Sequence, residues 1–152
     1  MATVAIAKTD GGIERAVEEA FSFIDITMDS SLPVIIKPNL NCIRTAETGA
    51  TTDPRVVEAV VQYVRRQYHV DDIYVVESDG TAVDADLAFQ LLGYNDLAKR
   101  LGLRTVNLSK TLCEIRKYPE NTSIKSVKVP VVFTKPHFLV SIAKIKTHDV
   151  CD

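Results

Sequence analysis

Apolar residues follow two different spacings along this chain. Some form short continuous runs, and others recur every three or four positions; the first pattern predicts strands and the second amphipathic helices. The predicted strands are residues 3–8, 34–37, 73–76 and 104–108, and the predicted helices are residues 13–28, a helix from Pro54, and residues 84–92 and 95–101. Strands and helices that alternate in this way predict a parallel α/β sheet.

The pattern changes after residue 110. Residues 112–118 and 123–129 read as two strands joined by a short turn, and an apolar strand over 138–143 then ends in Lys144. We therefore predict an α/β fold with three layers, in which a mostly parallel sheet is flanked by helices, and an antiparallel β arm near the C-terminus. The 152 residues suffice for one core, so a single domain over residues 1–152 is expected.

Composition narrows the class of protein. The chain is 46% hydrophobic and 25% charged, which are ordinary values for a globular domain. No apolar run approaches the roughly 18 residues of a membrane span, and the first residues lack the features of a signal peptide. These patterns predict a cytoplasmic protein without a membrane partner.

Charge is spread unevenly. Residues 1–109 carry 10 basic and 16 acidic side chains, whereas residues 110–152 carry 8 basic and 4 acidic ones. The basic third favours an anion as partner, but it is too modest and too poor in aromatic residues to predict nucleic-acid binding. Three widely spaced cysteines, Cys42, Cys113 and Cys151, do not form a disulfide or metal pattern. The sequence predicts no metal site, and it does not indicate whether a cofactor binds or which one.

The stretch from 34 to 53 carries the strongest functional signal. An apolar strand ends in Lys37, a long polar loop covers residues 38–52, and Asp53 with Pro54 begins a helix. Long loops in compact domains are often functional. The positive end of the helix would point at the same edge of the sheet and would favour an anion there.

Charged side chains also follow two other predicted strands. Ligands bind beyond the carboxyl ends of parallel strands, so these groups are expected to share one cleft. Glu77 comes directly after four apolar residues, and a carboxylate in that position must be paired or must have a tuned pKa. The predicted ligand-binding residues are Lys37, Asn39, Thr51, Asp53, Lys144 and Lys146, and the predicted catalytic residues are Glu77 and His148.

Each candidate also has a structural interpretation. Lys37 can extend into solvent from the end of its strand, and Asp53 can act only as a helix cap. Asp79, between Ser78 and Gly80, has the chemistry of a turn. His148 and Cys151 have a spacing seen in metal sites, which is weak evidence near a chain end.

Four segments of this sequence resemble the domain-of-unknown-function 362 family: residues 34–39, 49–54, 75–78 and 142–148. The resemblance implies an α/β domain, often followed by a ferredoxin-like segment with two iron–sulfur clusters, and a biochemical activity that is largely unassigned. The cysteine-rich segment is absent from this sequence, so iron–sulfur binding is not carried over. The resemblance implies the N-terminal part of a longer architecture. The positions that match the family motif are Lys37, Asn39, Thr51, Asp53, Glu77, Lys144, Lys146 and His148.

Three functional hypotheses follow. In the first, Lys37 and Lys144 or Lys146 hold a small phosphate or carboxylate, with Glu77 as general base and His148 as acid–base partner. In the second, which rests on the family context, the chain is a redox or metal-handling accessory of an iron–sulfur protein. In the third, it is a structural module that forms homo-oligomers through the arm at 112–129, because edge strands readily pair.

Overall fold

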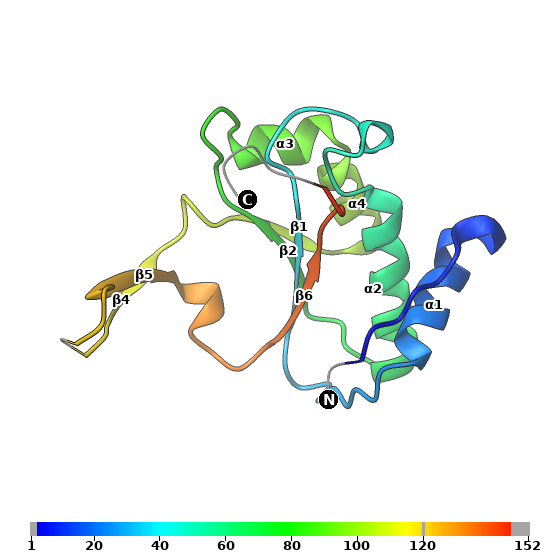
Figure 1. Ribbon diagram of the computed structural model, residues 1–152, viewed down its shortest axis with the longest axis horizontal. Coiled ribbons are helices and arrows are strands. Elements are labelled where there is room, and N and C mark those ends of the chain that lie inside the picture. The colour runs from blue at the N-terminus through cyan, green and yellow to red at the C-terminus, as the bar shows by residue number, and fades with distance from the viewer. Residues whose placement is uncertain (1–2, 120, 147–152) are drawn as a thin grey trace.

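The computed structural model describes residues 3–119 and 121–146 (Figure 1). It confirms the α/β class, with a parallel sheet, flanking helices and a separate antiparallel arm. The helices are α1 (Ile13–Ser22), α2 (Pro54–Tyr68), α3 (Ala85–Leu91) and α4 (Tyr94–Leu101). The strands are β1 (Val34–Pro38), β2 (Ile73–Glu77), β3 (Arg104–Asn107), β4 (Cys113–Lys117), β5 (Ser126–Pro130) and β6 (Phe138–Ile142).

The main sheet has the strand order β3-β2-β1-β6, and all of its neighbouring strands are parallel. Strands β4 and β5 form a second, antiparallel sheet of their own. Strand β1 lies between β2 and β6, so three carboxyl ends meet at its side. This topology places the end of β6 next to the end of β1, although the two strands are far apart in sequence.

The main core lies between the sheet and the helices. Alternate residues of β1 and β2 point to one face, where they meet the apolar stripe of α2 and the buried residues of α3 and α4. Val57, Val61 and Val64 of α2 are fully buried there. Valine has a modest helix propensity, so burial against the sheet is what stabilises this helix. Asp53 caps its first turn, and Pro54 occupies the first helical position.

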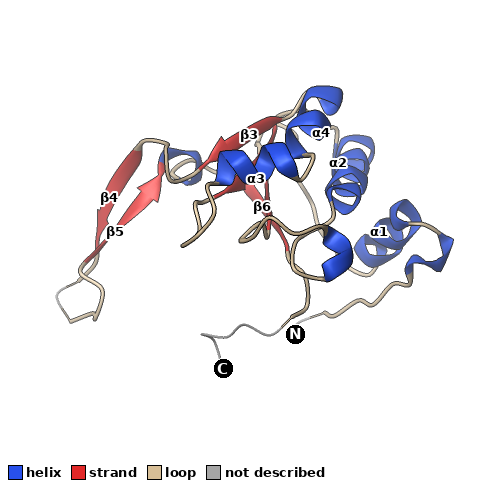
Figure 2. Cartoon of the chain, turned by 90° about the horizontal axis from the view of Figure 1, so that it is seen from above, coloured by secondary structure: helices blue, strands red, loops and turns tan. Residues whose placement is uncertain are grey.

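The two faces of the sheet differ. Helices α1, α2 and α4 lie to one side of it in Figure 1, and the segment between β3 and β6 lies to the other, as the view from above confirms (Figure 2). Ile35 and Val76 are fully buried but lie outside the core shared with the helices. A hollow of about 500 Å³, lined in part by Tyr74, Val106 and Val131, separates this second face from the arm.

Two predicted elements differ in the structure. The strand predicted for residues 3–8 is wrong, because the segment pairs with no described strand and leaves Val4 and Ile6 85% and 87% exposed. An apolar run is compatible with a strand but needs a neighbouring ladder to form one. The helix predicted to reach residue 28 ends at Ser22. Helix α1 packs mainly on α2, and beyond that contact Phe23 and Ile24 are exposed.

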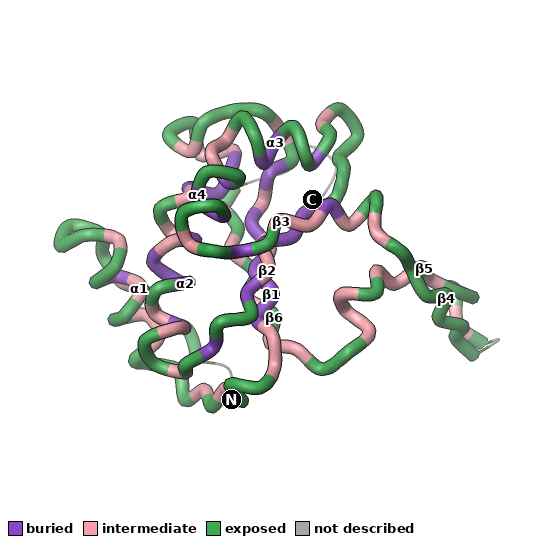
Figure 3. Tube along the Cα trace, turned by 180° about the vertical axis from the view of Figure 1, so that it is seen from behind, coloured by how far each residue is buried: buried purple, intermediate pink, exposed green. Residues whose placement is uncertain are grey.

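The arm is the least buried part of the molecule. All five residues of β4 are exposed, and the exposed tube of the hairpin extends away from the purple core in Figure 3. Its strands are shorter than the predicted ranges of 112–118 and 123–129. The described helices are too short or too polar to cross a lipid bilayer.

Candidate functional site

Three predicted site residues, which follow or end the strands β1, β2 and β6, meet at the carboxyl edge of the sheet. Strands β1 and β6 align Lys37 with Ser141 and Pro38 with Ile142, and Lys144 follows two residues later. On the other side of β1, strand β2 ends with Glu77. The topology therefore brings Lys37, Glu77 and Lys144 to one edge, as the sequence predicted for these three.

Glu77 is the most enclosed acidic group of this edge. Its side chain is 7% exposed, and Lys37 Nζ lies 2.8 Å from Oε1 and 3.0 Å from Oε2. The backbone N–H of Leu40 donates to Oε2 at 3.0 Å, and that of Ser78 donates to Oε1 at 2.9 Å. Both oxygens are thus saturated by charge-assisted bonds, which is how a buried carboxylate is stabilised. These contacts make Glu77 an anchor for the ammonium group of Lys37.

Lys37 is held without being enclosed. Its ammonium group contacts Glu77 and also donates to the carbonyl oxygen of Pro38 at 3.1 Å, yet its side chain is 38% exposed. The lysine therefore reaches solvent in a fixed orientation. Both interpretations of the sequence apply in part, since the residue ends its strand near solvent and is also paired.

The loop after β1 is fixed by Thr52. Its hydroxyl accepts from the backbone N–H of Asn39 at 2.9 Å and donates to the carbonyl of Ile142 at 2.6 Å. The backbone N–H of Thr52 donates to the carbonyl of Asn39 at 3.1 Å. One 3% exposed side chain thereby ties the start of the loop to the end of β6.

The side chains of Asn39 and Thr51 hydrogen-bond to the same loop. Asn39 Nδ2 donates to the carbonyl of Ala50 at 3.0 Å, and Thr51 Oγ1 donates to the carbonyl of Arg44 at 2.7 Å. Thr51 is 1% exposed. Both residues act as framework in these contacts, and a direct role in ligand binding stays a prediction.

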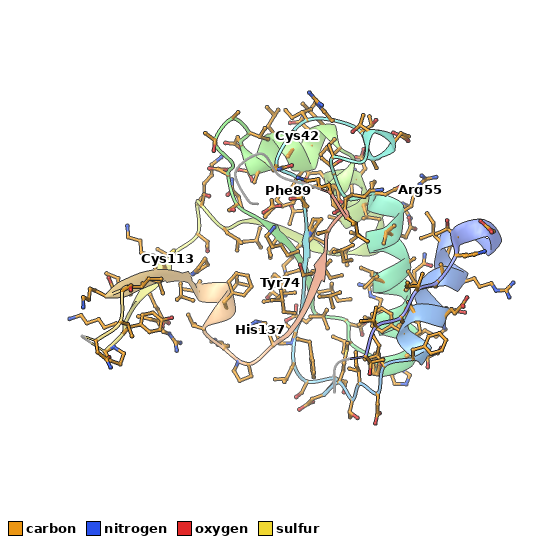
Figure 4. The ribbon with its side chains drawn as sticks, viewed as in Figure 1. Cys42, Arg55, Tyr74, Phe89, Cys113 and His137 are labelled. Atoms are coloured by element: carbon orange, nitrogen blue, oxygen red, sulfur yellow. The ribbon has the colours of Figure 1, made fainter. Side chains whose placement is uncertain are left out.

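Asp53 forms an ion pair as well as a helix cap. Its Oδ1 accepts from the backbone N–H of Arg55 at 2.9 Å, and Oδ2 accepts from the Arg55 guanidinium at 2.6 Å. The bond to Arg55 lowers the pKa of Asp53 below its ordinary value, and the charge of Lys144 adds to this through space. The anion at the start of α2 is therefore the chain's own carboxylate. Figure 4 shows Arg55 at this end of α2.

Tyr94 is a framework residue that the sequence did not reveal. It is 1% exposed at the start of α4, and its hydroxyl donates to the carbonyl of Thr52 at 2.9 Å. Burial raises the pKa of this phenol well above its ordinary value, so it stays a neutral donor. In the sequence it resembles any core aromatic, because its partner is a backbone carbonyl.

The structure describes two of the three predicted residues of the C-terminal motif. Lys144 is half-buried at the edge, and Lys146 is exposed. His148 lies outside the described residues, as does the His148–Cys151 spacing. The predicted catalytic role of His148 therefore stays a prediction.

A hollow of about 380 Å³ lies beside the first turn of α2. Among the described residues, its lining includes Thr51, Thr52 and Asp53 but none of the lysines of the edge. Glu47 and Asp53 bring two carboxylates to it and Arg55 one cation. This balance does not favour an anion, so the lysines and the hollow are separate features of the same edge.

A second polar cluster lies after β2 and β3. Asp79 Oδ1 accepts from the backbone N–H of Ala85 and from Asn107 Nδ2, both at 2.8 Å. Lys110 Nζ bridges Asp84 at 2.6 Å and Asp86 at 2.7 Å. Asp79 therefore has the role of a loop-ordering residue, as its turn chemistry suggested.

Metal-ligating side chains do not gather in the described residues. No group of three or more His, Cys, Asp or Glu side chains has a metal-binding arrangement there. Cys42 is half-buried in the loop above the sheet and Cys113 is exposed on the arm, well apart from each other (Figure 4).

Comparisons with known proteins agree with the motif segments. The model of the family described as "Domain of unknown function (DUF362)" matches residues 34–152, which include all four segments. Neither a curated protein nor a solved structure matches the chain.

Proposed function

This chain belongs to the DUF362 family, and we propose that the carboxyl edge of its sheet binds a small anion, a phosphate or a carboxylate, through Lys37 and Lys144. One observation carries the proposal: the pairing of β1 with β6 brings two lysines that are far apart in the sequence to adjacent strand ends. The family description includes no activity, so the proposal rests on the geometry of this edge.

The balance of charge at the edge supports an anion. Glu77 is compensated by Lys37 and two backbone N–H groups, and Asp53 is compensated by Arg55. Lys144 acts on Asp53 only as a nearby charge. Since Glu77 and Asp53 have partners of their own, neither of them requires the charge of Lys144, which is therefore able to attract a ligand anion.

Preorganisation is the second support. Glu77 orients the ammonium group of Lys37 at the carboxyl edge, and the side chain of Lys37 is 38% exposed there. An ammonium group that is already oriented loses less conformational entropy on binding than a free lysine does. Thr52 holds the loop after β1 to Ile142, two residues before Lys144.

The remaining predicted residues support the two lysines in different ways. Lys146 adds a positive charge next to Lys144, and Asn39, Thr51 and Asp53 hold the loop and helix in place. Glu77 orients Lys37. A catalytic step through Glu77 or His148 is a further hypothesis that binding alone does not require.

A binding titration of the full chain tests the proposal. Inorganic phosphate, pyrophosphate and citrate are titrated by calorimetry into the unmodified chain, Lys144→Met and Lys128→Met. Lys128 lies on the exposed arm, so its removal changes net charge equally but leaves the edge intact. We expect at least one anion to bind, and Lys144→Met to weaken it about tenfold or more while Lys128→Met has little effect.

Two outcomes would overturn the proposal. The first is that none of the three anions binds to a folded sample. The second is that Lys128→Met weakens binding as much as Lys144→Met, which would show that net charge alone attracts the anion. Lys144 is the better probe than Lys37 because Lys37 also stabilises the fold through Glu77.

The other two hypotheses keep their own tests. Metal and iron analysis of a complex isolated with an iron–sulfur protein would test the accessory role. Association of copies through the arm involves residues other than those of the carboxyl edge, and the oligomeric state of the chain tests it.

A further inference from the structure

The β4–β5 hairpin is an exposed two-stranded sheet. Each of its strands has one neighbour among the described residues, and it extends from the side of the sheet opposite α1 and α2 (Figures 1 and 2). Four large apolar side chains on or next to its strands are exposed: Leu112 (80%), Ile115 (67%), Tyr118 (49%) and Ile124 (59%). A two-stranded hairpin is only marginally stable alone, so a further strand on one of its edges would stabilise it.

The two free edges of the hairpin are not equivalent. Val131 N–H donates to the carbonyl of Leu112, and Tyr118 N–H donates to that of Lys125, both at 2.9 Å. Hydrogen-bonded pairs alternate along an antiparallel ladder, so the even-numbered residues of β4 bond to β5. The N–H and C=O groups of Cys113, Ile115 and Lys117 therefore point to the free edge.

The same alternation describes the outer edge of β5. There the outward backbone groups belong to Ser126, Lys128 and Pro130. Pro130 has no N–H to donate, and proline on an edge strand opposes pairing. The edge of β4 is consequently the one that is free to accept another strand.

The sequence around Ile115 is complementary to itself. We propose that two copies of this chain associate by antiparallel pairing of β4 with β4 of the second copy, about a two-fold axis at Ile115. In this register Glu114 faces Arg116 of the partner copy, Leu112 faces Tyr118, and Ile115 faces its own equivalent. Glu114 and Arg116 are thus opposite residues of the other sign, and Leu112, Ile115 and Tyr118 are opposite apolar ones. The remaining pair, Cys113 with Lys117, brings no like charges together.

The contacts of the single chain agree with this register. Arg116 and Glu114 lie on one face of β4, and their closest N···O distance of 3.9 Å is long for an ion pair; both side chains are more than half exposed. Directly opposed residues on paired strands are closer than residues two apart on one strand. The outward groups of Cys113, Ile115 and Lys117 form hydrogen-bonded pairs in this register, so the ladder continues into a four-stranded sheet.

An isologous contact of this kind closes as a dimer. The interface lies on the arm and does not use the lysines of the carboxyl edge. Association of copies is therefore independent of anion binding.

Sedimentation equilibrium of the full chain and its charge-reversed variants tests the register. We expect a dimer for the unmodified chain. Glu114→Arg and Arg116→Glu each place like charges opposite each other twice in the dimer and should raise the dissociation constant about tenfold or more. The double variant Glu114→Arg/Arg116→Glu restores opposite charges and should recover the dimer. A monomeric unmodified chain, or a double variant weaker than both single ones, would overturn the proposal.

Cross-linking gives an independent test. With Cys42, Cys113 and Cys151 replaced by serine, Ile115→Cys should form a disulfide between copies under mild oxidation, because paired strands bring the equivalent Cα atoms within the reach of a disulfide. Lys128→Cys is the matched control, since Lys128 is paired with Ile115 on the neighbouring strand but borders the other edge. Cross-linking of Lys128→Cys alone would place the contact at β5 and contradict the inference.

Discussion

The carboxyl edge and the β4–β5 arm use polar residues in opposite ways. At the edge, the residues Thr51, Thr52 and Glu77 are at most 5% exposed, and each is hydrogen-bonded to a backbone group, which for Thr52 and Glu77 belongs to another segment. On the arm, charged and apolar side chains alike face solvent. Most polar residues that follow the strands therefore hold the loops in place, and few charged groups are left for the proposed anion. On the arm the available groups are the backbone atoms of an open strand.

The largest expected effect is the loss of the hydroxyl of Thr52. Thr52→Val leaves the carbonyl of Ile142 and the N–H of Asn39 without their partner in a buried place. The free energy of unfolding should fall by about 2–4 kcal/mol, since each unsatisfied buried group costs roughly 1–3 kcal/mol. Urea unfolding followed by circular dichroism measures it.

A matched change on the arm serves as the control for Thr52. Thr122 also donates its hydroxyl to a backbone carbonyl, that of Pro119 at 2.7 Å, but in an exposed turn. Thr122→Val should change the free energy of unfolding by less than about 0.5 kcal/mol. Equal losses for the two variants would show that the edge is no more tightly built than the arm.

Removal of Lys37 should have the next largest effect. Lys37→Met leaves the 7% exposed side chain of Glu77 with its two backbone donors but without a cation. We expect a loss of about 1–3 kcal/mol, less than for a fully buried pair because Lys37 itself is partly exposed. Thermal and urea unfolding of Lys37→Met beside Lys128→Met measure the difference. A gain in stability would identify Lys37 as a ligand group held at a cost to the fold.

Part of this architecture follows directly from the sequence. Apolar runs that end in Lys37, Glu77 and Lys144 predicted both the strands and their common edge, because the carboxyl ends of parallel strands must meet. That Glu77 needs a partner or a tuned pKa follows from the cost of burying a carboxylate, whereas Lys37 as that partner is known from the structure. The cap of α2 followed from Asp53 and Pro54.

The contacts that fix the edge had no comparable signal. Thr52 bonds to Ile142, which is 90 positions away, and Tyr94 bonds to the carbonyl of Thr52. A backbone carbonyl is present at every residue, so no residue type marks it as a partner. The strand predicted at 3–8 was wrong for a related reason: an apolar run records a preference for extended structure but does not reveal whether a neighbouring strand exists.

A smaller effect is expected from the charge of Asp53. Asp53→Asn keeps an oxygen acceptor for the helix cap but removes the ion pair with Arg55, so we expect a loss of roughly 0.5–1 kcal/mol at neutral pH. The pKa of Asp53 is lower in the folded protein than in the unfolded chain. Its ionic contribution is thus present above about pH 4 and is lost as the pH falls through the folded pKa.

Urea unfolding between neutral pH and about pH 2.5 checks this sign. The difference between the unmodified chain and Asp53→Asn should be largest at neutral pH and should shrink towards the acid end. A difference that is constant over the whole range would mean that the asparagine cap itself, rather than the lost charge, destabilises the variant.

The smallest effect on folding is expected on the arm. Ile115 is 67% exposed, so Ile115→Ser at low protein concentration, where the chain is monomeric, should change the free energy of unfolding by less than about 0.5 kcal/mol. At high concentration the unmodified chain should gain stability through association, and the variant should gain less. Urea unfolding at two protein concentrations separates the stability of the single chain from the stability that association adds. A loss above about 1 kcal/mol in the dilute sample would show that the arm is part of the cooperative fold, and the contrast between the two regions would then be one of exposure alone.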